Sequence, residues 1–130
     1  LPADFPEAVE VSGLAQLMVE TDNRWERVKL ARAAGWKMPH DHPDIDPPHE
    51  ALQVVEQYRE ATRLPRTKDR PDDFRRRLDE AREAAERLEA TLRPGQGKDV
   101  DGEAAERAFR AAGDACTNCH VVYRDVPRRR

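Results

Sequence analysis

The sequence predicts an all-α fold, a four-helix bundle. In four separate segments apolar residues recur at alternating spacings of four and three, the seam pattern of packed helices. The clearest seam is that of the third segment: Phe74, Leu78, Ala81, Ala85, Leu88 and Leu92. Prolines and glycines fall between the segments, where they interrupt helices. The chain of 130 residues is long enough for one domain, so we expect a single domain over residues 1–130.

The first helix is expected from about Glu7 to Ala34. Its stripe comprises Leu14, Met18, Thr21, Trp25 and Val28, with Leu17 beside it. Gly35 follows as a C-cap, because glycine adopts the left-handed conformation that ends helices.

Prolines delimit the next two helices. The second is expected over Pro48–Arg63 and ends before Pro65. Its apolar face comprises Ala51, Leu52, Val54, Val55, Tyr58 and Ala61. The third begins at Pro71–Asp72, since proline suits a first helical turn. Its other face is charged, which is typical of a solvated surface with i,i+4 ion pairs and leaves a partner-docking surface as the alternative.

The fourth helix, expected over Ala104–Arg124 and capped by Asp101, carries a chemical signature. Cys116, Cys119 and His120 spell C-x-x-C-H, the attachment signal of a c-type haem. Positions i, i+3 and i+4 share one face of a helix. Both thiols therefore reach the vinyl groups on one side of a porphyrin, and the imidazole of His120 turns under the iron as the proximal ligand. The seam supports this, because it runs over Ala105, Phe109, Ala112, Cys116, Cys119 and Tyr123.

Two other interpretations of the motif compete with haem attachment. A redox dithiol of the thioredoxin type opens a helix after a strand, and no strand pattern precedes this one. A structural zinc site needs four ligands, and the missing ones would have to come from the histidines of a distant loop. Haem attachment is preferred to both.

The segment Ala115–Asp125, ACTNCHVVYRD, resembles the C-terminal haem site of the class II cytochromes c, the cytochrome c-prime family. That family carries C-x-x-C-H-x-x-[Tyr/Phe]-[Arg/Lys] on the last helix of a four-helix bundle, and Tyr123 and Arg124 take the last two places here. The resemblance covers about the last twenty residues. It implies one haem c, bound through Cys116 and Cys119, with Arg124 beside His120 or at a propionate.

The resemblance also implies that the first helix covers the far side of the haem. Low-spin members place a methionine there, so Met18 is the candidate sixth ligand; core packing is the equally weighted alternative. High-spin members place an apolar residue there, and Leu14 or Leu17 would then cap the iron. Dimerisation through the first two helices is common in the family, so a homodimer stays open.

Composition bounds the partners and the location. Net charge is −3, which does not suggest nucleic acid, and no apolar run reaches the roughly 18 residues of a membrane span. The family attaches haem outside the cytoplasmic membrane. We therefore expect a periplasmic protein whose targeting segment has been removed.

The segment Gly35–Pro48 is long for a connection inside a bundle and holds four prolines. Three interpretations compete. It is a polar crossover with Trp36 and Ile45 against the bundle; or Met38, His40 or His42 contacts the haem; or its histidines and aspartates bind a divalent cation.

Two functions follow. The preferred one is an electron-transfer cytochrome whose iron cycles between Fe(III) and Fe(II) and which docks redox partner proteins. The alternative is a five-coordinate binder of nitric oxide or carbon monoxide. Neither is an enzyme, since the first helix offers no distal histidine for acid–base chemistry. A helical interaction module would leave C-x-x-C-H unexplained.

Overall fold

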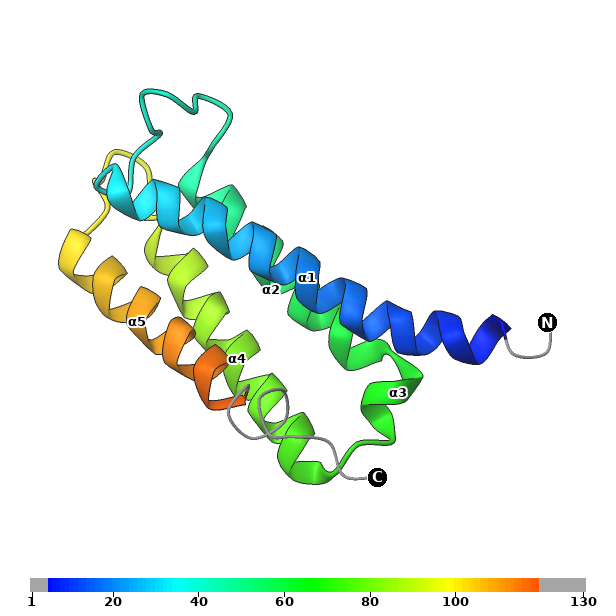
Figure 1. Cartoon of the computed structure of the whole chain (residues 1–130). Helices are drawn as coiled ribbons and strands as arrows, with labels where there is room; N and C mark the ends of the chain where they lie inside the picture. Colours follow the sequence, from blue (N-terminus) through cyan, green and yellow to red (C-terminus); the bar gives the residue numbers. More distant parts are fainter. Residues whose placement is uncertain (1–4, 120–130) are drawn as a thin grey trace.

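Four long helices and one single-turn helix make up the chain in a computed structural model that describes residues 5–119. They are α1 (Phe5–Ala33), α2 (Pro47–Arg63), α3 (Pro65–Lys68), α4 (Asp72–Thr91) and α5 (Gly102–Cys119). The long helices alternate in direction along the chain and pack α1 on α2, α2 on α4 and α4 on α5 (Figure 1). Residues 5–119 contain no strand. The predicted all-helical class is therefore confirmed for this part of the chain.

The buried core follows the predicted seams closely. All six positions of the third predicted seam are buried, the last of them at the C-cap of α4: Phe74, Leu78, Ala81, Ala85, Leu88 and Leu92. On α2 the predicted face is buried except at Leu52, which is only half-buried. Glu50 is buried there instead, at 2% exposure. A carboxylate tolerates such burial only with a charged partner, and α1 supplies one.

That partner is Arg27, which ties together α1, the crossover and α2. Its Nε lies 2.8 Å from Oε1 of Glu50, and its Nη2 lies 2.9 Å from Oδ2 of Asp44. The guanidinium beside Asp44 lowers the pKa of that carboxyl. The carboxyl-terminal half of α1 is thereby held in one position against α2.

The segment between α1 and α2 is a polar crossover anchored by two apolar side chains. Gly35 ends α1 with φ of 72°, as predicted. The amide of Gly35 donates to the carbonyl of Arg32, and that of Trp36 to the carbonyl of Ala31, which is the Schellman pattern. Trp36 and Ile45 are buried. The first interpretation of this segment is confirmed.

The single turn α3 was missed. Pro65 was expected to end the second helix, and Leu64 does leave the helical conformation, as residues before proline do. Proline also starts helices well, so a new turn begins at once. The hydroxyl of Thr67 then donates to the carbonyl of Ala61 and joins the turn to α2.

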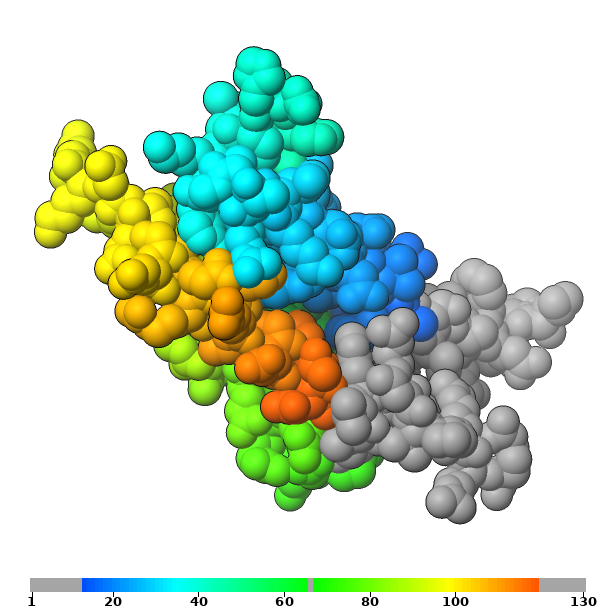
Figure 2. Space-filling view, turned by 60° about the vertical axis from the view of Figure 1, so that its left-hand side comes forward, coloured from blue at the N-terminus to red at the C-terminus, as the bar shows by residue number. Residues whose placement is uncertain are grey.

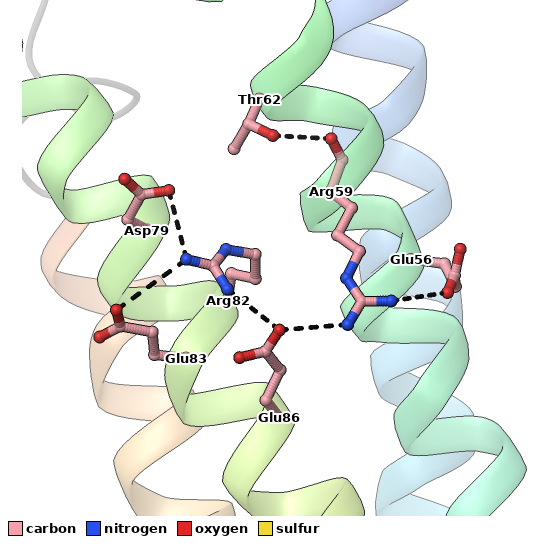
Figure 3. Close-up of polar contacts among 7 residues, drawn as sticks. All are labelled: Glu56, Arg59, Thr62, Asp79, Arg82, Glu83 and Glu86. Atoms are coloured by element: carbon pink, nitrogen blue, oxygen red, sulfur yellow. Dashed lines mark hydrogen bonds and ion pairs between the residues drawn. The ribbon is translucent and has the colours of Figure 1, made fainter.

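Ion pairs cover the outer face of α4, and some of them cross to α2. Glu86 accepts from Arg82 at 3.0 Å on its own helix and from Arg59 of α2 at 3.3 Å (Figure 3). Further i,i+4 pairs join Arg77 to Asp73 and Arg93 to Glu89. The predicted solvated, paired surface is confirmed.

Candidate functional site

The site lies where α5 runs beside α1. Figure 2 shows these two helices crossing one face side by side, α1 from cyan to blue and α5 from yellow to red-orange. Unlike the other neighbouring pairs, they bring few backbone positions close together. Side chains bridge them instead, and these bridges set their register.

Three side-chain contacts define that register. The ring of Trp25 stacks on Phe109, with centroids 4.9 Å apart and planes within 2°. A Cβ added to Gly113 would lie 3.6 Å from Cζ2 of Trp25. Nearer the start of α5, Arg32 forms an ion pair with Glu106. The helices are antiparallel, so later residues of α5 meet earlier residues of α1.

One turn beyond Gly113, this register brings Cys116 towards Thr21 and Asp22. The negative charge of Asp22 acts on the thiol and contributes to raising its pKa, although burial is the larger cause. Leu14, Leu17 and Met18 lie one to two turns earlier on α1 and pack at the edge of the core, as do both cysteines. The α1 residues proposed from the sequence thus fall at the same end of the α1–α5 seam as the thiols.

The two cysteines are free thiols with unequal surroundings. Both are half-buried, and burial raises the pKa of each. The charges of two α4 residues also act on the pKa of Cys119: Arg77 lowers it and Asp73 raises it. Cys116 instead meets α2, where the hydroxyl of Tyr58 lies within hydrogen-bonding distance of its Sγ.

Tyr58 is the site residue that the sequence reasoning missed. It was assigned to the apolar face of the second helix, and it is indeed buried, at 5% exposure. Its hydroxyl was the available signal, because a buried phenol requires a hydrogen-bond partner. Burial, with Cys116 beside it, raises the pKa of Tyr58 well above 10.

Three residues named from the motif, His120, Tyr123 and Arg124, lie outside the described residues. The loop candidates are described, and the structure places them at the other end of the bundle from the cysteines (Figure 1). From Glu106, which pairs with the last turn of α1, to Cys119 is about 20 Å along α5 at the ordinary helical rise. Met38, His40 and His42 are exposed. The structure thus does not support the interpretation of this loop as a haem contact.

The described residues supply part of what a covalently held haem would require. Cys116 and Cys119 lie three positions apart on α5, and they, like Leu14, Leu17 and Met18 of α1, are only partly buried where they pack against the core. A flat apolar group held there would cover these exposed portions.

Within residues 5–119, no three His, Cys, Asp or Glu side chains cluster as metal ligands would. A groove of about 840 Å³ lies along α3 and the outer face of α4. Its lining is mostly polar: Thr62, Thr67, Lys68, Asp72, Arg75, Arg76, Leu78, Asp79, Glu80 and Glu83. Most of its charged groups already pair with one another.

None of the helices between residues 5 and 119 combines the length and the apolar character that crossing a membrane requires. Comparisons with family models, with curated proteins and with solved structures each found no match to this chain.

Proposed function

We propose that this chain is a c-type haem protein that transfers single electrons. One observation carries the proposal: the two cysteines of C-x-x-C-H lie half-buried on α5, at the end of the seam where α1 presents Leu14, Leu17 and Met18. The motif supplies the means of attachment, and the seam supplies an apolar lining on the opposite side.

The chain's own groups would hold the haem in three ways. The thiols of Cys116 and Cys119 would each add across one vinyl group, with the sulfur on one carbon and the thiol hydrogen on the other, so no oxidant would be required. His120 would supply a nitrogen ligand to the iron. The bound haem contributes the Fe(III)/Fe(II) couple, whose potential depends on axial ligand, burial and nearby charge.

The opposite side of the haem decides between two functions. If the thioether of Met18 fills the sixth position, the iron changes oxidation state with little rearrangement and serves electron transfer. Leu14 and Leu17 pack at the same edge of the core, and this observation favours the second candidate, a five-coordinate binder of nitric oxide or carbon monoxide. In both cases the proposed role is that of a carrier or binder rather than an enzyme, because α1, on the proposed distal side, offers no histidine for acid–base chemistry.

The family resemblance extends this proposal to location and partners. Haem attachment of this type takes place outside the cytoplasmic membrane, so the proposed location is the periplasm, and the proposed partners are redox proteins. A homodimer through α1 and α2 remains compatible with this function.

Absorption spectroscopy tests the proposal. Haem that survives denaturation and acid–organic extraction from the wild type, but not from Cys116→Ala/Cys119→Ala, demonstrates the two thioethers. Extraction of all haem from the wild type would refute covalent attachment.

The sixth ligand is tested with a matched pair of variants. Met18→Ala is expected to convert a low-spin ferric spectrum to high spin and to admit carbon monoxide. Val19→Ala is the control, because Val19 is next to Met18 in the chain but is itself 55% exposed. A wild-type spectrum that is already high spin and binds carbon monoxide promptly would replace electron transfer by gas binding.

A further inference from the structure

We infer that Tyr58 is a positioning residue of the haem site: its hydroxyl holds the sulfur of Cys116 and becomes the donor to that sulfur once the thioether has formed. This inference rests on the proposed function, because it concerns the same attachment site. It adds a group from α2 to a site that the motif confines to α5.

The geometry of the bundle makes this contact specific. α2 packs on α1 and α4, whereas α5 packs on α4, so Tyr58 reaches α5 across the bundle interior. The phenol is 5% exposed and therefore has little access to water. A buried hydroxyl without a partner is costly, and Cys116 provides the partner.

Covalent attachment determines the direction of this hydrogen bond. In the free thiol either group is able to donate, because both carry a hydrogen. A thioether has lost the S–H hydrogen and keeps only lone pairs. With haem attached, Tyr58 is the donor and the sulfur of Cys116 is the acceptor.

The two thioethers would consequently differ, because the hydroxyl of Tyr58 from α2 lies beside the sulfur of Cys116. The hydrogen bond from Tyr58 draws electron density from the sulfur next to the porphyrin edge, which favours the ferrous state.

The first test uses the haem-free protein, so that it does not depend on the haem. In a Cys119→Ser background, the rate of alkylation of Cys116 is followed against pH. Tyr58→Phe keeps the ring but removes the hydroxyl, so the midpoint of the profile should rise by about one pH unit as the thiolate loses a hydrogen bond. If the substitution only gave the reagent easier access to Cys116, the plateau of the alkylation rate at high pH would change and the midpoint of the profile would stay the same.

Thr67→Val is the matched control, since it removes another buried hydroxyl that bonds the carbonyl of Ala61 rather than a thiol. Its midpoint should equal that of the parent. An unchanged midpoint in Tyr58→Phe, or an equal rise in Thr67→Val, would overturn the contact.

The second test uses the haem-loaded protein. Tyr58→Phe should lower the reduction potential without changing the spin state, and Thr67→Val should leave the potential unchanged. Loaded Tyr58→Phe protein with the wild-type potential would refute the inference while the proposed function stands. A shifted alkylation midpoint in a chain that never acquires covalent haem would refute the proposed function and the thioether role of Tyr58, leaving only the thiol contact.

Discussion

Replacing Arg27 by alanine tests how firmly α1 is held in the register that forms the site. The guanidinium of Arg27 is the charged partner of Glu50, whose carboxylate is almost fully buried at 2% exposure. Arg27→Ala leaves that carboxylate in the core without its partner and also releases Asp44 of the crossover.

The expected loss follows from the exposure of the two partners. Breaking a fully buried ion pair from one side costs about 3–5 kcal/mol. The side chain of Arg27 is 34% exposed, so water reaches the site and replaces part of the interaction. We therefore expect Arg27→Ala to lose about 2–3 kcal/mol of unfolding free energy. For a chain of this length that lowers Tm by about 7–11 °C.

Urea and thermal unfolding of the haem-free protein measure this loss. The matched control is Lys29→Ala, two residues after Arg27 on α1. It removes the exposed ion pair between Lys29 and Glu26 and should cost less than about 1 kcal/mol of unfolding free energy. Arg27→Ala/Glu50→Gln should recover part of the loss, because a neutral amide is cheaper to bury than an unpaired carboxylate. A loss for Arg27→Ala no larger than that of the control, or a double variant no more stable than the single one, would refute the reasoning.

Three further predictions concern Gly113 of the seam and two titrating groups. Gly113→Ala should stabilise the protein by up to about 1 kcal/mol, because alanine favours helix and its Cβ would lie at an ordinary contact distance of 3.6 Å from Trp25. Gly113→Leu should instead destabilise the protein by about 1–3 kcal/mol, because its side chain overfills the same space; thermal unfolding measures both changes. The lowered pKa of Asp44 contributes stability that is present above the ordinary pKa of 3.8 and is lost as pH falls through the lower folded-state pKa. The difference in unfolding free energy between wild type and Asp44→Asn, measured with urea, should therefore become smaller in acid. The raised pKa of Tyr58 contributes stability that is lost as pH rises above 10, so tyrosinate absorbance should show this phenol ionising only as the protein unfolds; ionisation in the intact fold would contradict its burial.

Local sequence signals were sufficient for the helices and their ends. Gly35 ends α1 in the left-handed conformation, and Asp101 caps α5 by accepting from the amides of Glu103 and Ala104. Every position of the predicted third seam is buried, and Ala84 of α4 is buried in addition. These features depend on residues within a few positions of one another, so a single chain segment contains the information for them.

Features that depend on two distant segments were the ones missed or left open. Nothing near Glu50 in the sequence marks it as buried, because its burial depends on Arg27 of another helix. Tyr58 looked like an ordinary core residue until its hydroxyl was found beside Cys116. The loop histidines were candidates until the crossover proved to lie at the end of the bundle away from the thiols.

By itself the sequence determined four amphipathic helices, the residues that end or cap several of them, and two motif cysteines on the apolar seam of the last helix. The tertiary structure decided which turn of α1 faces that motif. An apolar seam repeats with every turn, so its period is satisfied equally well by several registers. Single long-range contacts such as Trp25 on Phe109 select one of them. That selection brings Leu14, Leu17 and Met18, rather than the exposed loop, to the end of the seam where Cys116 and Cys119 lie.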